Sequence, residues 1–238
     1  MYVYSPAWPH GALQPAFTDL YTVIGTNKVH HDGVDIQTSR TMTVLVDRGE
    51  LTLINSVRLD DAGLRELDAL GRVRHVVRLG AFHGRDDPFY CDRHGAALWA
   101  LPAAVHADGR ATDRELREGG PLPVADAEVL PFASSRHPEA ALLLARDGGV
   151  LITCDAVQNW TRADEFFSPA TAAQFAAHGL LGAANIPATF LGACAPDRAD
   201  YQRLLDRPFR HLVTGHGEPL RDHAHARLAA RVAAAFSG

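Results

Sequence analysis

Three apolar runs of this chain each end in residues that can bind a metal ion or carry a proton. The run VVRLGAFH ends at His83 and is followed by Asp87, VLITCD ends at Asp155, and HLVTGH ends at His216. Histidine and aspartate side chains on strand-end loops suit a metal site, because the strands hold the ligands in place. Taken singly, an Asp at a strand end is usually a helix cap and a His-Gly pair is usually a turn. As a set, the four residues predict a metal site at which the ends of distant strands come together.

The strand before His83 is the clearest of the three. Within residues 73–79, a short apolar and mostly β-branched run is formed by Val73, Val76, Val77 and Leu79, and Gly80 ends it. Such a run is typical of a buried strand. We expect a polar loop to follow, in which His83, Arg85 and Asp87 lie within a few residues of one another. The alternative for this stretch alone is a strand followed by a solvated turn, and only the downstream Asp and His favour the site.

The other elements must position these strand ends. The pattern predicts two β-hairpins, with turns at residues 47–50 and 146–149, and a helix that Asp60 or Asp61 caps and Gly71 stops. Further strands are expected at residues 20–24, 96–103, 124–132 and 209–214, and further helices at 161–180, 197–205 and from 222 onward. Residues 25–35, with His30 and His31, and residues 106–123 are predicted to be irregular. This order of strands and helices predicts an α/β layered domain.

Composition narrows the class of protein. The chain has 238 residues, 47% of them hydrophobic and 21% charged, which is typical of a globular protein, and we expect one domain over residues 1–238 with two similar halves. The formal net charge of −5 argues against a nucleic-acid surface. No apolar run approaches the length that spans a membrane. The three cysteines, at 91, 154 and 194, are odd in number and far apart, so we expect reduced thiols and a cytoplasmic location.

These residues resemble the pattern of the metallo-β-lactamase superfamily. That pattern is HxHxDH after a strand, a later His, an Asp that closes a strand, and a His in a late strand–HG turn. The resemblance runs from about Leu20 to the C-terminal helix, and LTLINSVRLD followed by VVRLGAFH is similar to an uncharacterised branch of the superfamily. It implies a four-layer αββα sandwich built from two similar halves.

The resemblance also implies a ligand set, and this chain departs from it. His83 matches the first His of the motif, Asp87 its Asp, Asp155 the bridging Asp, and His216 the final His. The positions of the second and the last His of the motif hold Arg85 and Pro88. The later His falls near residues 136–138, where an alignment on the proline puts Arg136 in the ligand position and leaves His137 open. Each of the two metal sites has therefore lost a ligand, and we expect at most one divalent ion (Zn, Fe or Mn) or none.

Two functions remain open from the sequence. The first is a hydrolase with a mononuclear metal site, for which His83, Asp87, Asp155 and His216 are the candidate ligands. By the resemblance, its metal-activated water would attack an ester, amide, thioester or phosphodiester, and His83, Arg85 and Asp87 are the candidate catalytic residues. The second is a metal-free relative that binds a small molecule or a protein partner. The sequence identifies neither the substrate nor the oligomeric state.

Arg85 separates the two functions. A guanidinium stays protonated and cannot bind a cation. It could occupy the position of the missing ligand and pair with Asp155 or Asp87, which would leave the site ion-paired without a metal. It could also point into the solvent.

Overall fold

The computed structural model describes residues 2–31 and 33–237, and its strands form two sheets. The seven-stranded sheet has the order β1-β2-β3-β4-β5-β6-β7, and the four-stranded sheet has the order β11-β10-β9-β8. The strands of the first sheet are β1 (Gln14–Phe17), β2 (Leu20–His31), β3 (Val34–Asp47), β4 (Glu50–Ile54), β5 (Arg72–Arg78), β6 (Ala97–Ala100) and β7 (Arg114–Glu115). Those of the second are β8 (Ala127–Pro131), β9 (Ala140–Leu144), β10 (Val150–Ile152) and β11 (His211–Val213). The helices are α1 (Asp61–Leu70), α2 (Asp87–His94), α3 (Pro169–Ala177), α4 (Ala188–Cys194), α5 (Arg198–Leu205) and α6 (Ala224–Ala235).

One apolar cluster fills the space between the two sheets. In it, Leu45 and Val77 of the first sheet are joined by Leu142 and Ile152 of the second. Because successive side chains of a strand point to opposite faces, the neighbouring Val44 lies in a different cluster on the outer face. Consecutive apolar residues in β3 therefore mark a strand that is buried on both faces.

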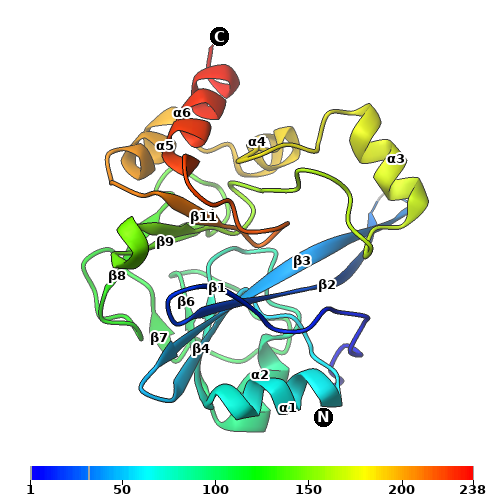
Figure 1. The fold of residues 1–238 in the computed structure, drawn as a ribbon, viewed down its shortest axis with the longest axis vertical. Helices are drawn as coiled ribbons and strands as arrows, with labels where there is room; N and C mark the ends of the chain where they lie inside the picture. The colour runs from blue at the N-terminus through cyan, green and yellow to red at the C-terminus, as the bar shows by residue number, and fades with distance from the viewer. Residues whose placement is uncertain (1, 32, 238) are drawn as a thin grey trace.

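Helices cover both outer faces of the sandwich. α1 and α2 pack on the seven-stranded sheet through Leu67 and Tyr90. α4, α5 and α6 pack on the four-stranded sheet through Phe190, Tyr201 and Leu228. Figure 1 shows the layers from bottom to top as helices, sheet, sheet and helices. This arrangement confirms the predicted α/β class and the four-layer αββα sandwich.

Helix α1 begins where the sequence predicts it. Asp60 has an extended backbone, and its side chain accepts a hydrogen bond from the Gly63 amide at 2.9 Å. We expect Asp60→Ala to lower the free energy of unfolding by about 1 kcal/mol, because an amide of the first turn loses its acceptor. Urea unfolding measures this loss. Asp61→Ala, an exposed neighbour in the first turn, is the control and should cost less than half as much; equal losses would contradict the capping role of Asp60.

The hairpin of β2 and β3 is longer than predicted. The two strands pair from Leu20 opposite Leu45 to His31 opposite Val34, so residues 25–31 and 34–35 of the expected irregular segment are extended strand. That prediction was wrong because most side chains of this segment are at least partly exposed and show no alternating apolar pattern, although the backbone is paired. His30 forms an exposed pair with Asp35 at 2.7 Å (Nδ1 to Oδ1). It is distant in the sequence from the predicted site residues, and its strand partner is not one of them. The side chain of His31 and residue 32 lie outside the described residues.

Three helices differ from the expected pattern. Only Pro169–Ala177 of the expected helix at 161–180 is helical, because Ser168 caps its N-terminus and Pro169 fits the first turn. α2 begins at Asp87, inside the segment predicted as a loop, and α4 was not predicted.

None of the helices in the described ranges is both long and apolar enough to cross a lipid bilayer.

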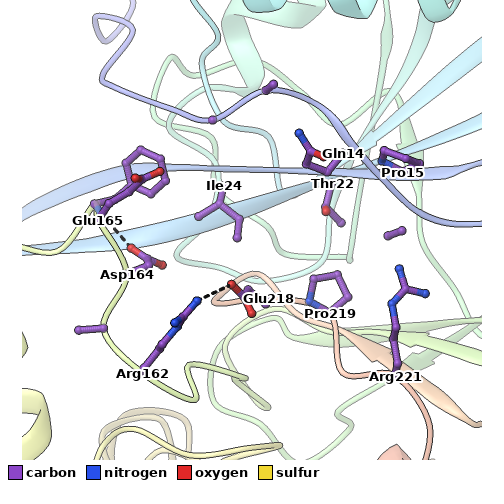
Figure 2. Close-up of a pocket in the computed structure, with 15 residues that line it drawn as sticks. Gln14, Pro15, Thr22, Ile24, Arg162, Asp164, Glu165, Glu218, Pro219 and Arg221 are labelled. Atoms are coloured by element: carbon purple, nitrogen blue, oxygen red, sulfur yellow. Dashed lines mark hydrogen bonds and ion pairs between the residues drawn. The ribbon is translucent and has the colours of Figure 1, made fainter.

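A cleft lies along β1 and β2. Its volume is about 850 Å³, and the segments 162–166 and 218–221 form the opposite wall. Figure 2 shows Arg162 directed at Glu218, with which it pairs at 3.5 Å, and Arg221 at the other end of the cleft. The side chains that line this cleft do not include the predicted metal ligands.

Candidate metal centre

Sheet topology brings the predicted strand ends together. β10 and β11 are parallel neighbours, so the residues that follow them, Asp155 and His216, leave the same edge of the four-stranded sheet. At this edge the Ala140 amide donates to the Leu79 carbonyl at 2.9 Å, which joins the start of β9 to the end of β5. The chain then turns at Gly80 and reaches His83. Parallel strands in an α/β protein commonly place functional residues at their carboxyl ends, and this arrangement follows that rule.

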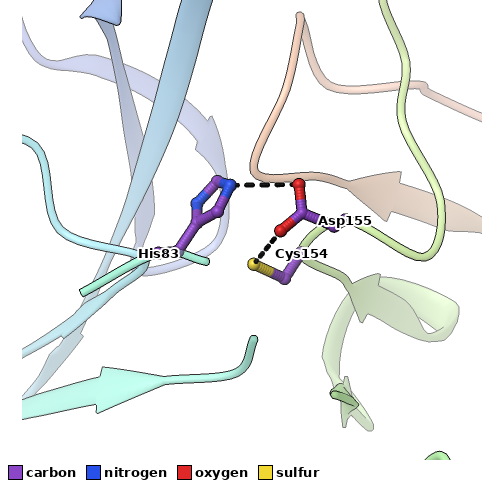
Figure 3. A group of neighbouring side chains, drawn as sticks. All are labelled: His83, Cys154 and Asp155. Atoms are coloured by element: carbon purple, nitrogen blue, oxygen red, sulfur yellow. Dashed lines mark hydrogen bonds and ion pairs between the residues drawn. The ribbon is translucent and has the colours of Figure 1, made fainter. Parts of the chain in front are cut away.

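Three side chains from these strand ends meet within hydrogen-bonding distance. The Nε2 atoms of His83 and His216 are 2.9 Å apart, and Asp155 Oδ1 lies 3.2 Å from the first and 2.9 Å from the second. Figure 3 shows the His83 ring directed at Asp155. His83 and His216 are buried, whereas the Asp155 side chain is 13% exposed. We call His83, Asp155 and His216 the triad; solvent reaches it from the side of the carboxylate.

The triad has more acceptors than protons. His216 Nδ1 lies 3.2 Å from the Ser39 carbonyl, which can only accept, so this nitrogen carries the proton and Nε2 presents a lone pair. Asp155 Oδ1, 2.9 Å from that lone pair, is also an acceptor when the carboxylate is ionised. Two acceptors at this distance repel each other unless a proton or a cation lies between them. The triad is therefore built around a positive charge.

The pKa values of His83 and Asp155 agree with an ionised carboxylate beside a neutral imidazole. Burial and the nearby Arg40 together lower the pKa of His83 to about 4, in spite of the opposing effect of Asp155. Burial acts to raise the pKa of Asp155, but the two histidines more than offset it and hold this pKa well below its ordinary value. At neutral pH, His83 is therefore neutral and Asp155 is charged, which are the protonation states that a metal ion requires of these ligands.

The triad fits one divalent ion. Zinc binds histidine nitrogen and carboxylate oxygen at about 2.0–2.2 Å, so donors around one ion lie roughly 3 Å from one another. The observed separations of 2.9 to 3.2 Å agree with this spacing. His83 Nδ1 has no hydrogen-bond partner among the described residues, so no hydrogen bond on that side turns the ring away from the triad. Two histidines and one carboxylate are the protein donors of many catalytic zinc sites and of mononuclear iron sites.

A thiol lies beside the triad. Cys154 is fully buried, its Sγ is 3.7 Å from Asp155 Oδ2, and ligand atoms of His83, Cys154 and Asp155 all lie within 4.8 Å of one another. Figure 3 shows the sulfur below the carboxylate. Burial, followed by the charge of Asp155, raises the pKa of this thiol well above its ordinary value. Without a metal ion, Cys154 is thus a neutral thiol that can donate weakly to Asp155.

Asp87 lies apart from the hydrogen bonds of the triad. It is the first residue of α2, and its Oδ1 accepts a hydrogen bond from Ser56 Oγ at 2.6 Å. Oδ2 has no partner among the described residues. Burial raises the pKa of Asp87 to about 6, although Ser56 and two arginines act in the opposite direction. Its role as a metal ligand or catalytic residue stays a prediction.

Arg85 adopts neither of the two expected arrangements. Its Nε and Nη2 donate to the two carboxylate oxygens of Asp86 at 3.0 and 2.8 Å, and its guanidinium lies 4.0 Å from the ring centre of Trp8. Nη1 is 3.4 Å from Asn27 Oδ1. The side chain is 23% exposed. Arg85 therefore belongs to the rim of the site and pairs with its own neighbour rather than with Asp155 or Asp87.

The site around the triad contains two buried charged residues that the sequence did not single out. Arg40 of β3 is 3% exposed, and Glu139 at the start of β9 is 1% exposed. Glu139 accepts a hydrogen bond from the Ala156 amide at 2.8 Å, and burial raises its pKa well above the ordinary value. The sequence carries a weak signal for Arg40, since it is the one charged residue within the apolar or hydroxylated stretch 38–46 of β3, and a buried charge requires a partner. Of the two positions left open for the later His, Arg136 and His137 are both exposed, and the His137 ring packs on Phe82 at 5.3 Å.

Solved structures of metallo-β-lactamases are similar to this chain over nearly its whole length. DIM-1 metallo-β-lactamase aligns with a TM-score of 0.66 at 12% identity, covering 95% of this chain and 100% of that one. VMB-1 at pH 5.5 aligns with a TM-score of 0.65 at 13% identity, over 94% and 96% of the two chains. The mono-zinc form of FIM-1 from Pseudomonas aeruginosa aligns with a TM-score of 0.65 at 9% identity, over 97% and 98%.

A protein with a different name is similar as well. A mutant flavo di-iron protein from Thermotoga maritima aligns with a TM-score of 0.64 at 13% identity, over 94% of this chain and 62% of that one. No protein-family model and no curated protein matches the chain. At these identities, the similarity concerns the fold.

Proposed function

The chain has the metallo-β-lactamase fold, and from this we propose that it is a hydrolase that depends on a single divalent ion held by His83, Asp155 and His216. The observation that carries the proposal is the spacing of the three donor atoms, which lie 2.9 to 3.2 Å from one another. Without a cation, His216 Nε2 and Asp155 Oδ1 are two acceptors in contact with no proton between them. The donor set favours zinc or iron.

The residues of the chain prepare this site for hydrolysis. The Ser39 carbonyl fixes the tautomer of His216, so that Nε2 is free to bind. Asp155, which is ionised and partly exposed, would hold the ion from the solvent-facing side of the triad. A bound divalent ion supplies Lewis acidity and lowers the pKa of a water molecule. Arg85 lies at the rim and is our candidate for stabilising negative charge on a substrate; Asp87 is the less favoured ligand, because Ser56 already holds it.

The expected substrate class is an ester, amide, thioester or phosphodiester. All four place negative charge on oxygen atoms when water attacks, and all four need the stabilisation that a cation and nearby donors provide. Hydrolysis of p-nitrophenyl acetate and of bis(p-nitrophenyl) phosphate by zinc-loaded and iron-loaded protein would separate acyl from phosphoryl substrates.

Zinc should stabilise the folded protein through the triad. Since the three donors come together only in the folded state, a zinc concentration of a hundred times Kd should raise the free energy of unfolding by about 2.7 kcal/mol. Elemental analysis should give one equivalent per chain. Asp155→Asn and His216→Gln should each abolish the stabilisation.

His137→Gln is the matched control for this zinc experiment. His137 is exposed and packs on Phe82 near the site, so its loss should leave zinc affinity unchanged. A weaker affinity in His137→Gln would add this residue to the ligand set. Wild-type protein that binds no divalent ion under these conditions would rule out the proposed function.

One observation favours a second candidate, a metal-free binding module. The buried Arg40 places a fixed positive charge close enough to lower the pKa of His83, and the same charge opposes a cation at the triad. In that case elemental analysis finds no metal, and a ligand would bind by hydrogen bonds and charge alone. Metal content of the purified protein decides between the two candidates.

A further inference from the structure

The buried Arg40 lies at the edge of the metal centre. The residue after it, Thr41, binds the loop of His216 twice: its amide donates to the Gly215 carbonyl at 2.8 Å and its hydroxyl donates to the Gly217 carbonyl at 2.8 Å. The backbone that carries Arg40 is therefore fixed to the backbone that carries His216. Because side chains alternate along a strand, Arg40 points to the opposite face from Thr41, toward Ser56.

Ser56 connects Arg40 to Asp87. Arg40 Nη2 donates to the Ser56 carbonyl at 2.9 Å, and the Ser56 hydroxyl donates to Asp87 Oδ1 at 2.6 Å. The remaining groups of the two charged side chains are complementary and unused. Arg40 Nε and Asp87 Oδ2 are both buried, and neither has a hydrogen-bond partner among the described residues. The buried carboxylate of Asp87 and the buried guanidinium of Arg40 thus contact the same serine. Each has one polar atom without a hydrogen-bond partner among the described residues.

The other charged residues near Arg40 and Asp87 have hydrogen-bond partners of their own. Asp86 is already paired, since both of its carboxylate oxygens accept hydrogen bonds from Arg85. Arg78 is the other cation near Asp87, but its guanidinium donates to the carbonyls of Gly80, Ala81 and Val105. A buried carboxylate needs a positive charge close by. Arg78 and Arg40 both act on Asp87, and Arg40 is the one that shares Ser56 with it.

We propose that the guanidinium of Arg40 takes the place of a second metal ion at Asp87. By the family resemblance Asp87 would bind that ion, but here Ser56 holds it next to a fixed cation. A cation that cannot dissociate keeps a positive charge near Asp87 and repels a further divalent ion. The inference rests on the proposed single-ion site and explains why that site takes one ion.

Replacing Arg40 tests this inference, with zinc stoichiometry and thermal unfolding as the measurements. Arg40→Met removes the charge and keeps most of the volume. We expect its melting temperature to fall in chelator, because the buried Asp87 loses a nearby positive charge, and to recover in zinc as a second equivalent binds. Arg40→Lys keeps a charge and should bind one equivalent, as the wild type does. Arg40→Met that still binds one equivalent with unchanged affinity, and gains nothing from zinc, would overturn the inference.

Two further variants locate the second ion and control for the loss of an arginine. Asp87→Asn in the Arg40→Met background should remove the second equivalent, because that ion would be bound by Asp87. Arg58→Met is the matched control: Arg58 is half-buried with an unpaired Nε and lies over the Phe89 ring, and its loss should leave one equivalent. If Arg40→Met does not fold, the double variant should, since both charges are gone; a double variant that also fails to fold counts against the inference.

The outcomes distinguish this inference from the proposed function. Wild type without metal, together with Arg40→Met that binds one ion through Asp87, would remove the single-ion hydrolase and keep the role of Arg40. Wild type with one ion and Arg40→Met with the same single ion would keep the hydrolase and remove the role of Arg40.

Discussion

Asp87→Asn and His83→Gln should change the pH dependence of stability in opposite directions. Asp87 has a folded-state pKa of about 6, above its ordinary value of 3.8, so the folded state holds the extra proton between these values. Stability from this group is present at low pH and is lost as the pH rises through that window, by about 3 kcal/mol for two pKa units. His83 has a folded-state pKa of about 4, below its ordinary value of 6.5. Its stability is present above that window and is lost on acidification, by about 3 kcal/mol.

The two contributions largely cancel in the wild type, so each variant is compared with the wild type at every pH. Urea unfolding in chelator between about pH 4 and pH 7 provides the free energies, over the range where both groups titrate. Relative to the wild type, Asp87→Asn should gain stability as the pH rises, whereas His83→Gln should lose it. The buried Glu139, whose pKa is also raised, acts in the same direction as Asp87, and the differences remove its contribution. Variant and wild-type curves that run parallel would contradict both assignments.

Gly80→Ala should be among the most destabilising single substitutions in the chain. A Cβ atom at Gly80 would lie 2.7 Å from Cys154 Sγ and would contact Glu139 Oε2 closely. Glu139 cannot simply move away, because it accepts the hydrogen bond of the Ala156 amide, next to Asp155. Overpacking costs about 1–3 kcal/mol, and an amide left without its acceptor costs about 1–3 more. We expect a loss of about 2–6 kcal/mol in urea unfolding, and at least tenfold weaker zinc binding because Asp155 shifts.

Gly192→Ala controls for the addition of a methyl group elsewhere. No atom of the described residues lies within 4 Å of a Cβ at this position, which is exposed on α4. An alanine there should be neutral or stabilise the protein by up to about 1 kcal/mol. Glu139→Ala in the Gly80→Ala background should recover part of the loss by making room for the methyl group. A Gly80→Ala protein as stable as the wild type would show that the contact between β5 and β9 can relax.

The layered fold was predictable because local signals and burial agree. The turn at Asp47–Glu50 joins two strands with apolar residues on both faces, and Asp60 and Gly71 bound the first helix as expected. The long β2–β3 hairpin was missed because its outer half buries little, so its side chains carry no hydrophobic pattern. Helix α2 was missed for another reason. Its acidic start, Pro88 in the first turn and Gly95 after the last are ordinary helix signals, but the motif drew attention to the same residues as ligands.

The candidate site was predictable only where strand ends carry it. His83, Asp155 and His216 each follow a strand, and sheet topology places such residues together. Arg40 lies in the middle of a strand, and its partner Ser56 lies after the next one, so no short spacing relates the two. The pairing of Arg85 with Asp86 was equally hidden, because a sequence shows which charges are present but not which neighbour a flexible side chain selects.

The separation of the triad along the chain has a consequence for the kinetics of folding. Its three pairs of residues are 61, 72 and 133 positions apart. Closing loops of this length costs chain entropy before the contacts repay it, so the donors meet only after the two sheets have docked. A contact that forms after the transition state changes the rate of unfolding and leaves the rate of folding nearly unchanged. An ion at the triad would therefore prolong the life of the folded chain without helping the chain to reach that state.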